Sequence, residues 1–170
     1  QVLAKVEREA LPAEVLLGKQ VFYNASDPRM SGEGYISCAT CHIDGGHDGR
    51  SYDFTDRGEG VRNTTSLRGR AGMGHGLVHW SANFDEIQDF EHDIRGAFGG
   101  TGFLTDNQFA SASTPLGPAK SGMSAELDAL AAYLTSLDRQ SVPRSPDRQA
   151  SGALTGAAQA GAQGFSSNGC

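Results

Sequence analysis

The stretch Cys38-Ala39-Thr40-Cys41-His42 decides how the rest of this sequence is interpreted. Two thiols separated by two residues and followed at once by an imidazole form the pattern to which c-type haem is attached. In that chemistry, Cys38 and Cys41 add across the haem vinyl groups and His42 ligates the iron on its proximal side. The motif therefore predicts one covalent haem held by Cys38, Cys41 and His42.

A zinc site and a thioredoxin-like redox pair are the two alternative interpretations of these cysteines. A structural zinc site needs four ligands at regular spacing. The sequence has no second cysteine pair, and its remaining histidines are scattered: His47, His75, His79 and His92. A thioredoxin-like pair requires alternating strands and helices, and no such alternation is visible. Both alternatives fit less well than haem.

The composition agrees with a chain that folds around a large apolar group. Glycine accounts for 23 of 170 residues and only 38% of the residues are hydrophobic, so long loops are expected. The formal net charge of −6 argues against nucleic acid or an anionic membrane surface as the partner. No apolar run approaches the ~20 residues of a membrane span. Eleven of the fourteen cationic residues are arginine, which suits pairing with carboxylates or haem propionates.

Apolar periodicity predicts three helices, over residues 12–24, 84–95 and 124–137, the last with Ser124 as its cap. Ser81 or Asn83 is expected to cap the middle helix. The segments 25–63 and 96–122 are expected to be loops, and 139–163 a linker. The side chains expected on a common face of each helix are Val15, Leu16, Lys19 and Phe22; Phe84, Ile87, Phe90 and Ile94; and Leu127, Leu130, Leu134 and Leu137.

The order of these elements resembles that of cytochrome c domains, in which an N-terminal and a C-terminal helix cross. The segment with Gly18 and Phe22 precedes the cysteine motif, and the leucine-striped helix follows it. The resemblance covers about residues 11–140. It implies a mostly α, loop-rich cytochrome c-like domain built around one covalent haem, with residues 1–10 as an N-terminal extension.

Three sequence blocks carry a narrower resemblance: Asp27-Pro28-Arg29-Met30-Ser31, Ile36-Ser37 leading into the cysteine motif, and Arg62-Asn63-Thr64-Thr65-Ser66-Leu67. They resemble the bacterial di-haem cytochrome c peroxidase family and its methylamine-dehydrogenase-maturing relatives. The resemblance implies two haem domains, one peroxidatic and one for electron transfer, with a calcium ion between them. It also implies a periplasmic or secreted location, and Asn63 matches an asparagine of the calcium site.

The sequence departs from that family at the position of its distal groups. The stretch before Arg62-Asn63 contains no histidine, and Ser81-Ala82 replaces an Asp-Gly pair. Glu91 is the nearest candidate for a catalytic acid–base carboxylate, because it falls beside Phe84 and Ile87 on the core-facing side of its predicted helix. The alternative is an ordinary surface carboxylate in an acidic segment.

The sixth iron ligand is expected from the stretch Arg70-Ala71-Gly72-Met73-Gly74-His75-Gly76-Leu77-Val78-His79-Trp80. Its glycines allow the backbone to approach a ligand closely. His79 is the leading candidate because the neighbouring Trp80 suggests a buried position, and His75 and Met73 are the alternatives.

The last ten residues repeat a feature of the first helix. Gly161-Ala162-Gln163-Gly164-Phe165 precedes Cys170 as Gly18-Lys19-Gln20-Val21-Phe22 precedes Cys38. Cys170 would then be the first cysteine of a second haem motif, and residues 141–170 a linker with the start of a second cytochrome c domain. The alternative is a coincidence in a Gly- and Ala-rich tail that carries a free thiol.

These features leave three candidate functions. The first is electron transfer by a c-type cytochrome domain of a di-haem cytochrome c peroxidase-like protein, with a redox protein or a second haem domain as partner. The second is reduction of hydrogen peroxide, with Glu91 as the acid–base group. The third is a structural or sensory haem module of a large secreted protein.

Overall fold

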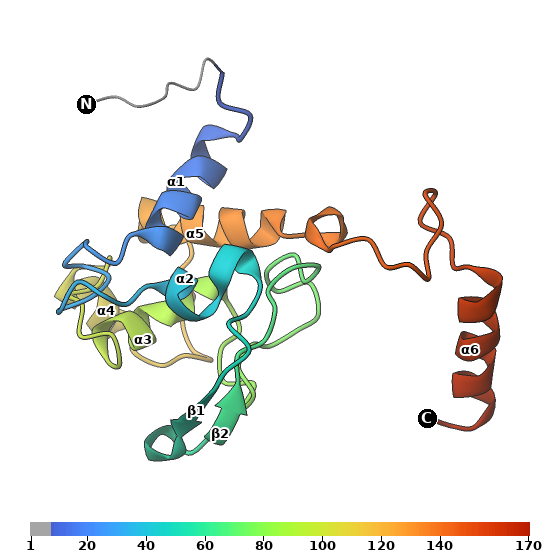
Figure 1. The fold of residues 1–170 in the computed structure, drawn as a ribbon. Helices are drawn as coiled ribbons and strands as arrows, with labels where there is room; N and C mark the ends of the chain where they lie inside the picture. The colour runs from blue at the N-terminus through green and yellow to red at the C-terminus, as the bar shows by residue number, and fades with distance from the viewer. Residues whose placement is uncertain (1–7) are drawn as a thin grey trace.

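The computed structural model describes residues 8–170 as a small, mostly helical fold (Figure 1). Residues 1–7 of the predicted extension 1–10 lie outside the described residues. The α-helices are α1 (Ala13–Tyr23), α2 (Cys38–Cys41), α3 (Glu91–Arg95), α4 (Asp106–Ser111), α5 (Ala125–Ser136) and α6 (Gly156–Ser167). The two strands are β1 (Ser51–Phe54) and β2 (Gly60–Asn63). Short 3-10 helices are η1 (Ile43–Gly45), η2 (Thr55–Arg57), η3 (Ile87–Phe90) and η4 (Arg139–Ser141).

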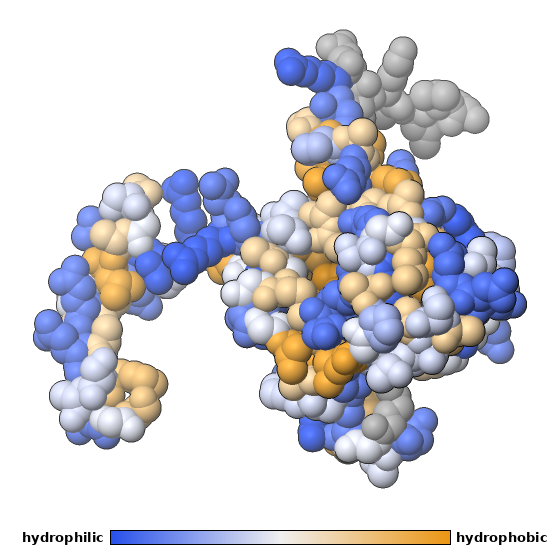
Figure 2. Space-filling model, turned by 180° about the vertical axis from the view of Figure 1, so that it is seen from behind, coloured by the Kyte–Doolittle hydropathy of each residue, from blue (hydrophilic) through white to orange (hydrophobic). Residues whose placement is uncertain are grey.

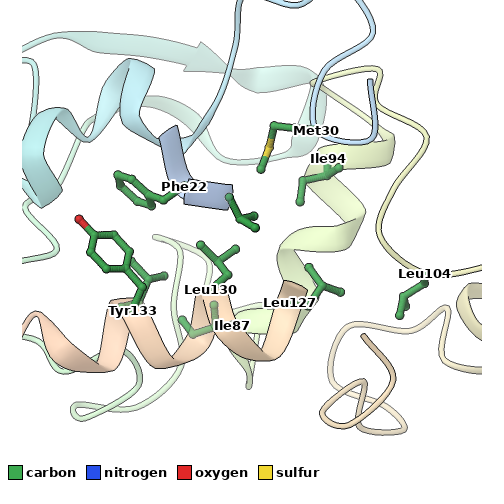
Figure 3. Packing of buried hydrophobic residues seen from close by; sticks show 10 residues of the cluster. Phe22, Met30, Ile87, Ile94, Leu104, Leu127, Leu130 and Tyr133 are labelled. Carbon is green, nitrogen blue, oxygen red and sulfur yellow. The ribbon is translucent and has the colours of Figure 1, made fainter. Parts of the chain in front are cut away.

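The first helix crosses α5 at very close range, and this crossing organises the core. A Cβ atom added to Gly18 would lie 1.8 Å from the carbonyl oxygen of Ala129, so only glycine fits there. The rings of Phe22 and Tyr133 pack edge to face with centroids 5.2 Å apart. Figure 3 shows the side chains that meet between α1, α5 and α3: Phe22, Leu127, Leu130, Tyr133, Ile87 and Ile94, with Met30 beside them.

The outer two predicted helices are confirmed, and the middle one is shorter than expected. Ser124 accepts a hydrogen bond from the backbone N–H of Leu127 and caps α5 as predicted. The predicted helix 84–95 begins only at residue 87, with Glu86 at its N-terminus, and divides into η3 and α3. Ser81 and Asn83 do not cap it. On α1, the buried positions are Gly18, Val21 and Phe22, and Lys19 is exposed.

Short helices and a pair of strands interrupt the segments that were expected to be loops. Strands β1 and β2 form an antiparallel hairpin in which Tyr52 pairs with Arg62 and Phe54 with Gly60. Helix α4 is closed at its start by a reciprocal pair of hydrogen bonds between Thr105 and Gln108. The Thr-x-x-Gln pattern is a recognised start signal, so this helix could have been predicted from the sequence.

The last helix stands apart from the rest of the chain. An extended segment leads from α5 to α6, and Figures 1 and 2 both show α6 separated from the helical body. None of the residues of α6 is buried, and Phe165 is 62% exposed. The predicted linker 139–163 therefore begins with η4, continues without a regular helix or strand, and is helical from Gly156 onward.

Candidate haem-binding cavity

A cavity of about 360 Å³ lies beside the helix crossing, within the ~300–1,000 Å³ range of small-molecule sites. Cys38, Cys41 and His42 line it together with His75 and His79. The cavity lies between α2, the β-hairpin, the loop 64–80 and the inner sides of α3 and α5. Its apolar lining consists of Phe22, Ile36, Phe54, Leu67, Leu77, Val78, Trp80, Ile87, Phe90, Ile94, Phe98, Leu130 and Leu134.

The two cysteines reach the cavity from one short helical turn. Ser37 precedes this turn, and its backbone N–H donates to the Thr40 hydroxyl at 2.9 Å, which closes the first turn of α2. Cys38 lines the cavity and is half-buried. That burial raises the pKa of the Cys38 thiol to about 12. Both thiols are free of disulfides.

His42 lines the cavity, and a hydrogen bond to the backbone holds one of its ring nitrogens. Its Nδ1 lies 2.9 Å from the carbonyl oxygen of Thr65, and because a carbonyl only accepts, Nδ1 carries the proton. The Nε2 lone pair is then available for a metal. Burial lowers the pKa of His42 and so favours the neutral imidazole, which is the form that binds metals. A hydrogen bond from Nδ1–H to a backbone carbonyl is a common support for metal-binding histidines.

His79 is held by two aromatic rings. Its ring centroid lies 4.2 Å from that of Phe84 and 4.9 Å from that of Phe90. The backbone of His79 is left-handed, with φ of 65°, a conformation that tertiary contacts must hold for a residue with a side chain. Trp80 was expected to bury this histidine, but Trp80 is 56% exposed. The burial of His79 therefore comes from the two phenylalanines.

Polar groups surround both nitrogens of His79. Nδ1 lies 2.9 Å from the side-chain oxygen of Asn83, and Nε2 lies 3.4 Å from a carboxylate oxygen of Asp93. Glu59 lies 3.8 Å from Nδ1 and accepts a hydrogen bond from the Ser81 hydroxyl. Glu59 and Asp93 both line the cavity. Sequence reasoning missed these two carboxylates because Glu59, Asp93 and His79 come from separate segments that meet only in the fold.

The two alternative sixth ligands lie in different surroundings. His75 lines the cavity but is exposed, and its Nε2 lies 2.5 Å from a guanidinium nitrogen of Arg70. Met73 is partly buried against the hydrophobic core and does not line the cavity. The structure therefore brings His42, His75 and His79 to one cavity, and leaves Met73 outside it.

Glu91 lies outside the cavity and is fully buried. Its carboxylate accepts hydrogen bonds from Arg95 Nε and from the backbone N–H groups of Phe103 and Leu104, at 2.8 to 3.0 Å. The alternative expectation of a surface carboxylate is wrong, because Glu91 binds the loop that follows α3. Asn63 lines the cavity at the end of β2, and its backbone carbonyl accepts a hydrogen bond from the Trp80 indole N–H at 3.2 Å.

The comparison with protein families agrees with the blocks quoted from the sequence. Residues 12–89 match the family model described as di-haem cytochrome c peroxidase. This part of the chain therefore resembles that family, and it includes α1, the cysteine motif, the hairpin and His79. No curated protein and no solved structure matches the chain. The remaining wall of the cavity, from Phe90 to Leu134, comes from residues beyond the matched segment.

The donor groups and the lining fit a haem. Two thiols, a neutral imidazole with an available nitrogen and a second imidazole border one largely apolar space. Within residues 8–170, no group of three or more His, Cys, Asp and Glu side chains is placed to hold a single metal ion. Among the same residues, no helix has the length and apolarity needed to cross a bilayer.

Proposed function

We propose that this domain binds one haem covalently through Cys38 and Cys41, with His42 as the proximal iron ligand, and transfers electrons. The observation that carries the proposal is that Cys38, Cys41 and His42 line the same largely apolar cavity, while the contact of His42 Nδ1 with the Thr65 carbonyl leaves Nε2 available. The match of residues 12–89 to a family of haem proteins supports it independently. The bound haem supplies an iron that alternates between the ferric and ferrous states.

The protein's own residues position that group and give it access to a partner. Thr65 fixes the imidazole of His42, and Phe84 and Phe90 hold His79, our candidate for the sixth ligand, with His75 and Met73 as alternatives. Leu77 and Trp80 line the cavity and are also 47% and 56% exposed. The cavity therefore lies close to the surface there, as electron exchange with a redox protein or a second haem domain requires.

Covalent attachment is tested by expressing the chain in a host that matures c-type cytochromes. After denaturation and extraction with acidified acetone, the protein should keep its colour and its mass should exceed that of the polypeptide by one haem. Cys38→Ala and Cys41→Ala should each abolish two-bond attachment, whereas Cys170→Ala, at an exposed thiol outside the cavity, should change nothing. Complete loss of haem from the wild-type chain on extraction would refute the proposal.

Reduction of hydrogen peroxide is the second candidate, and the carboxylates at the cavity favour it. Peroxide takes up two electrons and two protons to give two waters, so a peroxidase needs a group that moves protons beside the iron. Glu59 and Asp93 lie within 4 Å of His79, whereas Glu91, the residue expected from the sequence, is engaged by the backbone of another loop. Peroxide consumption with a reduced donor shows which of these three carboxylates moves the protons. It is measured for the variants Glu59→Gln, Asp93→Asn and Glu91→Gln.

The remaining expectations from the family resemblance are proposals as well. We propose a periplasmic or secreted location and a calcium ion near Asn63. We also propose that residues 141–170 lead into a second haem domain beginning at α6, because α6 carries the Gly-x-x-x-Phe unit of α1 with its apolar side uncovered. A structural or sensory haem module is the third alternative, and it predicts a haem that sustains no turnover between an electron donor and an acceptor protein or peroxide.

A further inference from the structure

Four ionised side chains line the cavity, and they divide into two groups. Glu59 and Asp93 lie beside His79. Arg62 and Arg70 carry the opposite charge, and neither forms an ion pair with a carboxylate in the part of the chain that the structure describes. Two guanidinium groups that line a largely apolar cavity and form no ion pair there with the described residues are available to a ligand that itself carries negative charge.

Arg62 reaches the cavity from the β-hairpin. It pairs across the strands with Tyr52, and the inner face of the hairpin carries Tyr52, Phe54 and Arg62, all half-buried. One guanidinium nitrogen of Arg62 donates to the neighbouring carbonyl of Val61 at 2.9 Å. A guanidinium has five N–H donors, so most of its hydrogen-bonding capacity remains available for a ligand.

Arg70 lies where the cavity meets the surface. It lines the cavity and also a wide, open depression of about 630 Å³ formed with Arg139 and Gln140. Its Nε donates to the carbonyl of Ser66 at 2.7 Å, and one terminal nitrogen lies 2.5 Å from His75 Nε2. These two contacts fix the direction of the guanidinium and leave its other N–H groups for a ligand at the cavity mouth.

We infer that Arg62 and Arg70 bind the two propionate carboxylates of the haem and raise its reduction potential. This inference rests on the proposed function. A haem is an apolar macrocycle with two carboxylates, and the planar fork of arginine matches a carboxylate with two parallel hydrogen bonds. Two fixed positive charges close to the iron stabilise the ferrous form, which carries one positive charge less than the ferric form.

The test compares Arg62→Gln, Arg70→Gln and the double variant with Arg68→Gln in the haem-loaded protein. Arg68 is the matched control because its Nε donates to the carbonyl of Asp44, and it does not line the cavity. The two readouts are the propionate bending bands in the resonance Raman spectrum and the midpoint potential from spectroelectrochemical titration.

Each cavity variant should shift the propionate bands. Each should also lower the midpoint potential. At the ambient potential where the wild-type haem is half reduced, the ferric-to-ferrous ratio should rise about threefold to tenfold, and a tenfold rise corresponds to a fall of about 59 mV in the midpoint potential for one electron. Arg68→Gln should change neither readout. Where a glutamine variant yields no folded protein, Arg62→Lys and Arg70→Lys should keep the potential and still shift the bands, because a lysine retains charge but not the two-pronged contact.

Unchanged bands in both cavity variants, with potentials equal to that of Arg68→Gln, would overturn the inference while leaving haem attachment intact. A wild-type chain without covalent haem would instead overturn the proposed function, and the inference with it. The haem content by mass, measured first, separates these two outcomes.

Discussion

The two histidines proposed as iron ligands are held in different ways. His42 donates from Nδ1 to a backbone carbonyl, a contact that does not depend on the protonation of another side chain. His79 relies on side chains, with Asn83 on one nitrogen and Asp93 on the other. Releasing His79 from iron would leave it with partners already in place. The side of the cavity at His79 is therefore the one expected to accept an added ligand.

The first prediction concerns the spin state of the haem-loaded protein. Replacement His79→Gly should convert a low-spin ferric spectrum to a high-spin one and allow cyanide to bind, because it removes the sixth ligand. His47→Gly is the control, since His47 is exposed and does not line the cavity. Visible and paramagnetic-resonance spectra measure the change. A low-spin spectrum in both variants would point to His75 or Met73 instead.

The buried ion pair between Lys120 and Asp89 gives a second prediction at the residue scale. Both side chains are almost completely buried and lie 2.6 Å apart, and Asp89 also accepts from the backbone N–H groups of residues 85 and 86. Lys120→Met should lower the free energy of unfolding by about 3–5 kcal/mol, because it leaves a buried carboxylate without its counter-charge.

The control for that change is Asp106→Asn. Its carboxylate pairs with Arg95 but is 95% exposed, so the loss should be at most about 1 kcal/mol. Urea unfolding followed by circular dichroism measures both values. Equal losses in the two variants would contradict the role assigned to Lys120.

A third prediction follows from the pairing of Arg29 with Asp27 and Glu126. Hydrogen bonds from Arg29 lower the pKa of both carboxyl groups in the folded protein. A lowered folded-state pKa contributes stability above the unfolded value of about 4, and this contribution is lost as the pH falls through the folded-state value. Arg29→Gln should therefore flatten the dependence of unfolding free energy on pH between about 5 and 3.

Unfolding by urea at a series of pH values measures this slope. Arg148→Gln is the control, because Arg148 donates to the carbonyl of Gly152 rather than to a carboxylate. A wild-type slope in the Arg29 variant would show that Arg29 does not lower the pKa of the two carboxyl groups.

Helices α1 and α6 share a sequence unit but not an environment, and this difference supplies the fourth prediction. Gly18 lies against α5, whereas a Cβ at Gly161 would meet nothing within 4 Å. Gly18→Ala should destabilise the domain by several kcal/mol or prevent folding, since the added atom overlaps a backbone carbonyl. Gly161→Ala should leave stability unchanged or raise helix stability by about 0.5–1 kcal/mol. Thermal unfolding of the two variants side by side provides the measurement, and similar effects would refute the crossing at Gly18.

Helices with a continuous apolar stripe were predictable, and elements that depend on distant partners were not. Helix α5 has leucines at helical spacing and a serine cap, so its sequence specifies it locally. The hairpin has strands of only four residues, and the half-buried Tyr52, Phe54 and Arg62 gain their role from the cavity that they cover.

The candidate site was likewise predictable only in part. The cysteine motif identifies His42, but the closeness of Glu59 and Asp93 to His79 arises only when segments from three parts of the chain meet.

For the whole molecule, the chain divides into a body that shares one core and a tail that contributes nothing to it. The core cluster extends from Val21 to Leu134, and Leu137 packs against it. The Leu137 carbonyl accepts hydrogen bonds from the backbone N–H groups of Gly69 and Ala71, at 2.9 and 3.2 Å, which ties the end of α5 to the loop that carries the candidate iron ligands. The boundary of the folded unit should therefore fall just after Leu137 and η4, and not at α6.

The last prediction tests this boundary by shortening the chain. Ending the protein after Pro143 removes α6 and the extended segment, but keeps Leu137 and the Ser141 hydroxyl that accepts from Gly69 N–H. Haem content and melting temperature should equal those of the full chain.

Ending the protein after Ser136 instead removes the two hydrogen bonds to the Leu137 carbonyl and the contact of Leu137 with the core. We expect this loss to lower the free energy of unfolding by more than 1 kcal/mol. Each kcal/mol lost should lower the melting temperature by about 3–5 °C. A marked fall already in the longer of the two shortened chains would show that the tail packs on the body and that the domain boundary lies elsewhere.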